Sequence, residues 1–210
     1  MIYKTICGSR SYGLELPTSD YDIVVCGENN IKSDIPHSHE IIIKPENFHK
    51  KLLLLTDDAY DMQLYFPSEI LISSELSDYI DVHKEEIISA NLNRVYSSHM
   101  RKANGLSVDL DKWGIRYPKR SAYSCLFYDT IYRYATQDIV FENAFKPDED
   151  FKQWLLLVKK REIPIEEILK RNEELRKRAE SVSDFYANVE NKIIINKTIS
   201  DINEILQINI

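Results

Sequence analysis

The sequence has 210 residues, of which 43% are hydrophobic, 10% aromatic and 29% charged, and its formal net charge is −7. These values are typical of one or two globular domains, and they exclude collagen, low-complexity disorder and a disulfide-rich scaffold. The longest apolar runs are far too short to span a bilayer, and the first ten residues lack the pattern of a signal peptide. We therefore expect a cytoplasmic protein with no membrane partner.

The first ninety residues show a mixture of strand and helix signals. Short runs rich in β-branched residues, bounded by turn residues, predict strands at residues 2–7, 21–26 and 40–44. Pro45 then opens an expected helix that continues to Leu55, since proline is tolerated in a first helical turn. The segment at residues 57–67 is ambiguous between strand and helix.

From Ser68 onward the pattern becomes helical. Helices are expected at residues 68–76, 85–104, 119–136, 148–160, 164–183 and 189–207. Residues 105–118 contain two glycines and a proline and are expected to form a loop or linker. The predicted fold class is therefore α+β, with a small mixed-sheet domain at residues 1–88 followed by a helical domain at residues 89–210.

Charge and cysteine usage add two further expectations. Residues 1–90 carry 7 Lys and Arg against 16 Asp and Glu, whereas residues 91–183 carry 18 against 14. Carboxylates in the first half can hold metal ions and cations in the second can hold phosphates, but from charge alone solvated surfaces are the favoured explanation of the imbalance. Cys7 and Cys26 lie in apolar strand-like runs without zinc-ligand spacing, so they are expected to be packing residues.

The most informative stretch is CGSRSYGLELPTSDYDIVV, which begins at Cys7. A strand ends, Gly8 and Ser9 turn the chain, and Asp20 and Asp22 open the next strand. Residues two apart on a strand point the same way, so the two carboxylates are expected to lie side by side and to favour Mg²⁺ bound together with substrate phosphates. Gly8 permits close approach of a phosphate, and Ser9 can donate its hydroxyl and N–H to that group.

This arrangement resembles the nucleotidyltransferase superfamily of DNA polymerase β. It is most similar to a bacterial and phage family of predicted nucleotidyltransferases with a GS…SDxD stretch, carried here by GSRSYGLELPTSDYDI. The resemblance implies a nucleotidyltransferase catalytic domain that moves a nucleoside monophosphate from a nucleoside triphosphate (NTP) to a hydroxyl. Two Mg²⁺ ions, or Mn²⁺ in their place, would be held by Asp20 and Asp22, with Gly8, Ser9 and Arg10 near the phosphates. The acceptor is left open among RNA, a protein side chain and a small molecule.

The family also has a third metal-binding carboxylate, for which the sequence offers two candidates. Glu40 opens EIIIK, the strand that the resemblance selects, and Asp61 lies in YDMQLYF. We expect Glu40 to be the catalytic acid and metal ligand, with Asp61 as the alternative. If the strand of Glu40 lies beside that of Asp22, the two strand openings converge on one metal pair.

The helical half departs from the family pattern K-x-x-x-H-x-x-R. Lys119 is kept, but Tyr123 occupies the histidine position and Leu126 the arginine position. Lys119 and Tyr123 are the expected contacts to the nucleotide, through charge and through stacking or hydrogen bonding. The same departure supports a second hypothesis, in which the chain is a catalytically degenerate nucleotide-binding or regulatory module, for instance in phage–host conflict or RNA repair.

Overall fold

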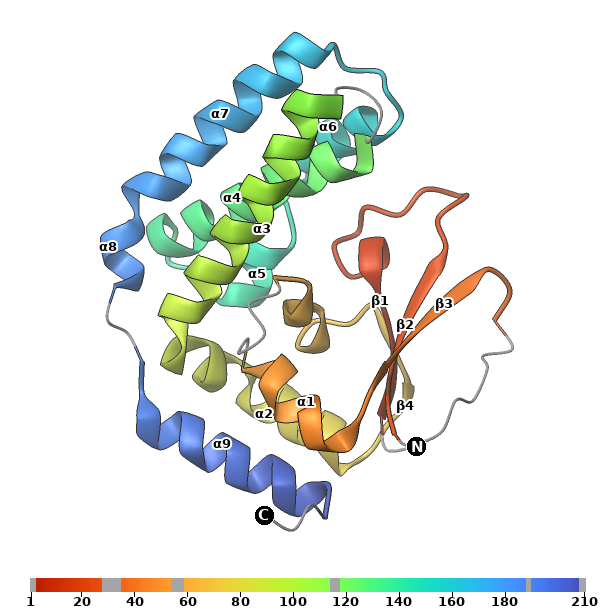
Figure 1. The fold of residues 1–210 in the computed structure, drawn as a ribbon, viewed down its shortest axis with the longest axis vertical. Helices are drawn as coiled ribbons and strands as arrows, with labels where there is room; N and C mark the ends of the chain where they lie inside the picture. Colours follow the sequence, from red (N-terminus) through yellow and green to blue (C-terminus); the bar gives the residue numbers. More distant parts are fainter. Residues whose placement is uncertain (1–2, 28–34, 54–58, 114–117, 188–189, 208–210) are drawn as a thin grey trace. The chain divides into compact units, whose positions relative to one another are not determined.

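A computed structural model describes residues 3–27, 35–53, 59–113, 118–187 and 190–207 (Figure 1). The chain forms two compact units, one made of Met1–Arg94 with Val189–Ile210, the other of Val95–Asn188. A mixed sheet comes first along the chain and helices follow, which confirms the predicted α+β class. The two units are described separately below.

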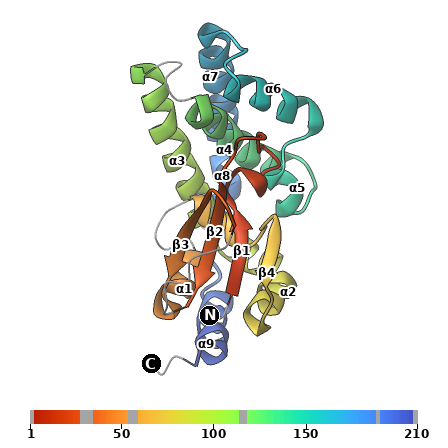
Figure 2. The same ribbon diagram turned by 90° about the vertical axis from the view of Figure 1, so that its right-hand side faces the viewer.

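The first unit contains a four-stranded mixed sheet. Its strands are β1 (Tyr3–Cys7), β2 (Tyr21–Cys26), β3 (Ser38–Ile43) and β4 (Glu69–Ile72), in the spatial order β3-β2-β1-β4 (Figure 2). β1 pairs antiparallel with both β2 and β4, whereas β2 and β3 run parallel. The C-terminal end of β1 and the N-terminal ends of β2 and β3 therefore meet at one edge of the sheet.

Helices cover one face of this sheet (Figure 1). They are α1 (Pro45–Leu52), the 3₁₀ helix η2 (Ala59–Leu64) and α2 (Glu75–Ala90), and α9 (Lys192–Ile205) packs against α1 and α2. The Tyr3 ring of β1 contacts the Phe48 ring of α1 edge-on, with centroids 6.0 Å apart. Tyr3 pairs with Cys26, and Cys26 and Asp22 lie on the same face of β2 because they are four residues apart. Asp22 therefore lies on the face of the sheet that the helices cover.

The last helix returns to the first unit, which differs from the expectation of one helical domain from residue 89 to the end. Asn191 N donates to Ala90 O, and Tyr79 Oη of α2 donates to Asp201 Oδ2 of α9 at 2.9 Å. The amphipathic α9 buries Thr198, Ile202 and Asn203 in this unit. The sequence places α9 directly after the helices of the second unit, and no local pattern predicts that it packs against α2.

The predicted helix at residues 68–76 is wrong, because Glu69–Ile72 form the edge strand β4. Thr5 Oγ1 of β1 donates to Glu69 O at 2.7 Å, and Ser68 N donates to Ile6 O. A run as short as EILI carries no periodicity that separates strand from helix, so pairing with β1 decides its conformation. Helix α2 begins only after Ser74, which forms a capping box with Ser77.

The second unit is helical. Its helices are α3 (Leu92–Trp113), crossed by the unit boundary after Arg94, α4 (Pro118–Thr136), α5 (Phe141–Phe145), α6 (Glu149–Lys159), α7 (Ile165–Ser181) and α8 (Ser183–Tyr186). The predicted helices at 119–136, 148–160 and 164–183 are confirmed to within a few residues. The predicted linker at 105–118 is helical up to Trp113, and residues 114–117 lie outside the described part of the chain.

Helix α4 is the centre of the second unit. Its residues from Ser121 to Tyr128 are all buried, as expected for a helix surrounded by others. Asn172 of α7 donates to Ser124 Oγ at 2.7 Å, and Ser124 Oγ donates to Ala103 O of α3. These bonds join three helices through one small residue.

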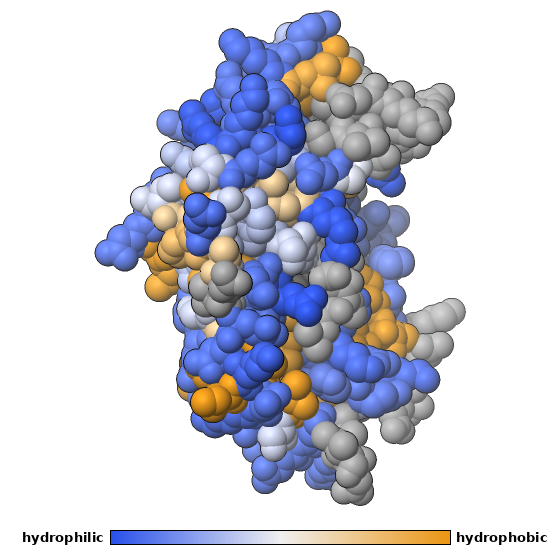
Figure 3. All heavy atoms as spheres, turned by 60° about the vertical axis from the view of Figure 1, so that its left-hand side comes forward, coloured by the Kyte–Doolittle hydropathy of each residue, from blue (hydrophilic) through white to orange (hydrophobic). Residues whose placement is uncertain are grey.

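No helix in the described part of the chain has the length and apolar composition needed to cross a membrane. The face shown in Figure 3 is mostly hydrophilic, with hydrophobic side chains in small separate groups. Exposed large hydrophobic residues such as Val82 and Ile193 lie on different helices, which is ordinary for isolated surface side chains.

Candidate nucleotide and metal site

The Gly8–Ser9 turn and Asp22 meet at one edge of the sheet. Cys7, the last residue of β1, pairs with Asp22 of β2, so the chain leaves β1 beside the carboxylate. The 3₁₀ helix η1 (Gly8–Arg10) follows at once, and Leu14 N donates to Ser9 O at 2.8 Å to close the loop. The antiparallel pairing of β1 and β2 therefore brings the Gly8–Ser9 turn and Asp22 together.

Gly8 is required at its position by both conformation and space. Its φ is +72°, in the left-handed region that residues with a side chain rarely adopt. A Cβ atom placed on Gly8 would lie 1.9 Å from Asp22 Oδ2 and 2.7 Å from Asp22 Cγ. The backbone of the turn therefore packs directly against the Asp22 carboxylate, which holds that side chain at the sheet edge.

Gln63 is a part of this site that no sequence pattern indicates. Its Oε1 accepts a hydrogen bond from Gly8 N, and its Nε2 donates to Tyr12 Oη at 2.9 Å. The side chain thus ties η2 to both ends of the Gly8 loop, while Cys7 Sγ contacts Gln63 O at 3.6 Å. Gln63 positions the turn, and only the folding of a distant segment onto β1 reveals it.

Ser9 is 2% exposed, and its hydroxyl makes no hydrogen bond to any residue that the structure describes. A serine hydroxyl within the fold ordinarily finds a partner. Since Ser9 follows Gly8 directly, its N–H and Oγ belong to the same turn as the Asp22 contact. This is the arrangement needed for a donor to phosphate oxygens.

Asp20 lies one residue before β2 and is exposed, two residues from Asp22. Within the described residues, no three His, Cys, Asp or Glu side chains gather as a metal-binding group. The two carboxylates still suit Mg²⁺, which commonly takes one or two protein carboxylates and completes its coordination with substrate phosphates and water. The donor set therefore fits a metal that arrives with the nucleotide.

Glu40 does not join Asp22. Strand β3 lies beside β2, but Glu40 pairs with Ile23, so its side chain is on the opposite face of the sheet from Asp22. There it forms an ion pair with Lys4 of β1, with Nζ and Oε1 3.6 Å apart and the Glu40 side chain 16% exposed. The expected convergence with Asp22 fails because β3 begins at Ser38, which makes Glu40 its third residue.

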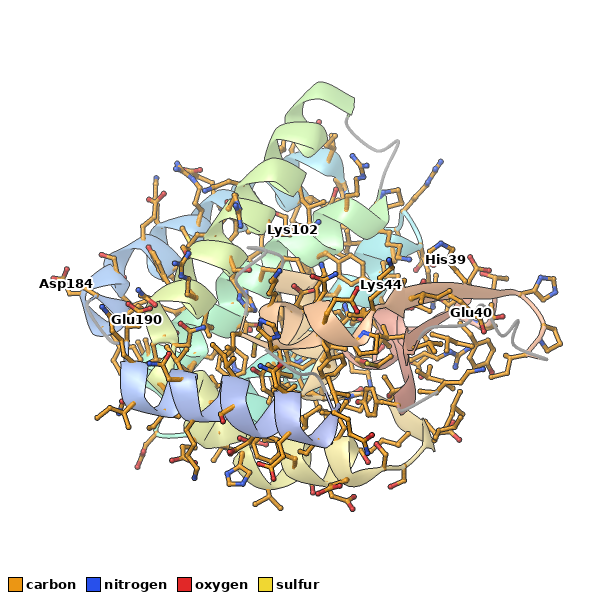
Figure 4. The ribbon with its side chains drawn as sticks, turned by 60° about the horizontal axis from the view of Figure 1, so that its bottom comes forward. His39, Glu40, Lys44, Lys102, Asp184 and Glu190 are labelled. Carbon is orange, nitrogen blue, oxygen red and sulfur yellow. The ribbon has the colours of Figure 1, made fainter. Side chains whose placement is uncertain are left out.

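His39 occupies the position that Glu40 was expected to fill. It pairs directly with Asp22 in the β2–β3 register, so both side chains lie on the same face of neighbouring strands. Figure 4 labels His39 and Glu40 on β3, where strand alternation gives them opposite sides. His39 is exposed, and an imidazole beside a carboxylate can accept or donate a proton.

Asp61, the alternative third acid, has a different partner. It lies in η2 with 8% exposure and forms an ion pair with Lys51 of α1, with Oδ1 and Nζ 3.5 Å apart. Burial, followed by the Asp61 charge, raises the pKa of Tyr65 well above its usual range. Asp61 thus lies in a buried network that includes Lys51 and Tyr65.

Arg10 and the thiol of Cys7 complete the surroundings. The Arg10 guanidinium lies 3.9 Å from the centre of the Tyr21 ring, and Tyr21 is on the opposite side of β2 from Asp22. Arg10 is therefore held at the same edge of the sheet but over its other face. Burial, with Asp22 contributing, raises the pKa of Cys7 to about 12, so this thiol stays neutral.

Lys119 and Tyr123 belong to α4 of the second unit. Lys119 is exposed and its Nζ lies 5.9 Å from the centre of the Tyr123 ring, while Lys159 approaches the same ring at 6.0 Å. Tyr123 is 4% exposed and stacks on Phe127, and Leu126 is fully buried. The positions that differ from the family pattern are therefore core positions of this unit.

The chain matches no family model, no curated protein and no solved structure. The functional interpretation therefore rests on the residues of the site itself.

Proposed function

We propose that the protein is a nucleotidyltransferase that moves a nucleoside monophosphate from an NTP to a hydroxyl acceptor. The observation that carries the proposal is the packing of Gly8 against Asp22, with Ser9 and Asp20 next to them. A glycine turn at a strand end, facing a carboxylate at the start of the neighbouring strand, suits a triphosphate that brings its own metal ions.

Each residue has a distinct part in this reaction. The Ser9 hydroxyl and N–H face the non-reacting phosphates, Gly8 lets the backbone come close to them, and Asp20 and Asp22 would hold Mg²⁺ or Mn²⁺. A metal ion held by these carboxylates would neutralise charge on the attacking and leaving oxygens. The acceptor oxygen forms a bond to the α-phosphorus, the bond to the bridging oxygen breaks, and pyrophosphate leaves. The acceptor is RNA, a protein or a small molecule, and the labelling experiment described below identifies which.

The acceptor proton needs a base, and Glu40 lies on the wrong face to take it. His39 is the neighbour of Asp22 in the strand register, so we assign it this role. This gives a site of two carboxylates and one imidazole in place of three carboxylates.

The direct test is incubation of the protein with each labelled NTP, Mg²⁺ or Mn²⁺, and a cell lysate. RNA, protein and small molecules are then separated, and label in one fraction identifies the acceptor class. Binding is measured apart from chemistry by thermal shift, since an NTP that binds the folded state raises the melting temperature. Stabilisation that needs both NTP and metal supports the site, and its absence with every NTP contradicts it.

The second candidate is a degenerate module that binds a nucleotide without transferring it. The observation that favours it is that Glu40 lies on the opposite face of the sheet from Asp22, in an ion pair with Lys4. Such a module shows metal-linked stabilisation by an NTP but labels no fraction of the lysate. The two assays together therefore separate the two candidates.

Replacing Ser9 by alanine is expected to raise the KM for NTP about tenfold with little change in kcat. The hydroxyl would contact phosphates that do not react, so its loss removes binding that is equal in ground and transition states. Since this hydroxyl has no hydrogen-bond partner among the described residues, the unfolding free energy should change little. Initial rates across NTP concentrations test this, and a large fall in kcat at saturation would give Ser9 a different role.

His39→Gln is expected to slow single-turnover transfer about a hundredfold while leaving the Kd for NTP unchanged, as loss of a general base does. The matched variant is Glu40→Gln on the adjacent position. It should keep transfer within about threefold but lower the unfolding free energy by about 1–3 kcal/mol, because Lys4 loses its partner on the other face. The opposite pattern of rates would restore Glu40 as the catalytic acid.

A further inference from the structure

The helical unit contains a pocket that is separate from the proposed catalytic residues. It has a volume of about 630 Å³ and is lined by residues of α4, α6 and α7 and of the turn before α6. That volume lies within the range of sites that hold small molecules. All of its lining residues belong to the second unit, and the catalytic assignment above uses none of them.

Two arginines of α7 line this pocket without an ion pair. Arg171 and Arg178 are seven residues apart, which places them about two turns apart on the same side of the helix. Neither makes a hydrogen bond or ion pair with a described residue, and each lies over a ring, Phe151 at 5.8 Å and Tyr132 at 5.7 Å. Guanidinium groups placed in this way retain their donors for a ligand.

Asp129 of α4 lines the same pocket as these arginines. Its side chain is 14% exposed, and Oδ2 accepts no hydrogen bond from a described residue, although Arg133 Nη1 is 3.8 Å away. Arg133 is already committed, since it donates to Lys146 O at 2.8 Å and to Asn143 O at 3.1 Å. Both Arg171 and Arg178 act electrostatically on Asp129, so their charges converge near one carboxylate.

An aromatic wall stands on the α6 side of the pocket. Trp154 stacks on Phe151, with centroids 5.9 Å apart and planes 11° from parallel. Its Nε1 donates to Glu167 Oε1 at 2.9 Å, and Asp148 accepts from Phe151 N. Glu167 and Asp148 therefore accept hydrogen bonds from residues of α6, whereas Arg171 and Arg178 form no ion pair with a described carboxylate.

We propose that this pocket binds a phosphorylated compound with a planar ring, of about the size of a nucleoside monophosphate. The phosphate is held by Arg171 and Arg178, and the ring packs against Trp154. The proposal does not depend on the transfer reaction proposed above, because its residues, its ligand class and its lack of a metal requirement are different.

Adenosine 5′-monophosphate (AMP) in EDTA is the probe, and the fluorescence of Trp154 is the readout. The chain has two tryptophans, so a Trp113→Phe background leaves Trp154 as the single reporter. We expect saturable quenching by AMP, and affinities at least about tenfold lower for adenosine and for inorganic phosphate. No saturable quenching by AMP up to about 5 mM, or quenching by spermidine instead, overturns the proposal.

Arg178→Gln tests the phosphate contact, with Arg176→Gln as its matched control on the same helix. Arg176 is engaged by Glu173 and Glu180 at 2.8 and 2.9 Å and does not line the pocket. Arg178→Gln should lower the AMP affinity at least about tenfold, whereas Arg176→Gln should leave it unchanged. Equal affinities in the two variants would contradict the proposal, and circular dichroism checks that both remain folded.

The pH dependence of AMP binding reports on Asp129. Burial raises the pKa of its carboxyl to about 6, Arg133 of α4 opposes that rise, Asp148 before α6 adds to it, and Arg171 and Arg178 of α7 oppose it. A charged Asp129 competes with the ligand for the two arginines, so its protonation as pH falls through about 6 should strengthen binding. The phosphate of AMP also titrates at about pH 6. The AMP affinity of the wild type is therefore compared at each pH with that of Asp129→Asn, which has the same ligand but no titrating carboxyl at this position.

Asp129→Asn should bind AMP more tightly than the wild type at neutral pH, and the ratio of the two affinities should shrink toward one below about pH 5. A ratio that does not change with pH removes Asp129 from the site. Asp22→Asn, in the first unit, should leave AMP quenching unchanged. AMP binding by a protein that transfers no nucleotide would therefore contradict the nucleotidyltransferase proposal but not this one.

Discussion

Asp22→Asn is expected to reduce nucleotidyl transfer by at least about a thousandfold, and Asp20→Asn to have a similar effect. Each change removes one of the two carboxylates proposed to hold the metal, and metal-ion stabilisation of a phosphoryl transition state amounts to several kcal/mol. The measurement is the single-turnover rate with saturating NTP and Mg²⁺, for whichever acceptor the labelling experiment identifies.

The control for this prediction is Glu15→Gln, which removes an exposed carboxylate from the same loop between Ser9 and Asp20. It should transfer at the wild-type rate, so that a general loss of negative charge is separated from loss of a metal ligand. Urea unfolding shows whether each asparagine variant is folded. Substantial Mg²⁺-dependent transfer by a folded Asp22→Asn protein would disprove the metal assignment.

Gly8→Ala is expected to lower the unfolding free energy by about 2–4 kcal/mol and to abolish metal-linked NTP stabilisation. Alanine is strained at a φ of +72°, and its Cβ would overlap the Asp22 carboxylate. Either the turn or Asp22 must move, and both belong to the proposed site. Urea titration followed by circular dichroism measures the stability, and thermal shift with NTP and Mg²⁺ measures the binding.

Gly105→Ala is the matched control, because it is the same substitution in a helix. Gly105 lies in α3, and a Cβ placed there meets nothing within 4 Å. The variant should be as stable as the wild type or more stable by up to about 1 kcal/mol, since alanine favours helix over glycine. If both glycine variants behave alike, the contact between Gly8 and Asp22 is not important for the fold.

The sequence by itself determined the elements that local pattern controls. Strands Tyr3–Cys7 and Tyr21–Cys26, and helices such as Glu149–Lys159, follow from β-branched runs, turn residues and capping signals. The meeting of Gly8 with Asp22 was also predictable, because two successive antiparallel strands must place the end of one beside the start of the next. These features depend on residues close together in the chain.

The tertiary structure alone decided which side chains share the site. A strand that begins at Ser38 instead of Glu40 puts His39 on the Asp22 face and Glu40 with Lys4, since alternation reverses the face with every residue. Gln63 reaches Gly8 only because η2 packs against β1, and EILI becomes a strand only because β1 offers an edge. Long-range pairing overrides short-range preference wherever the local signal spans only a few residues.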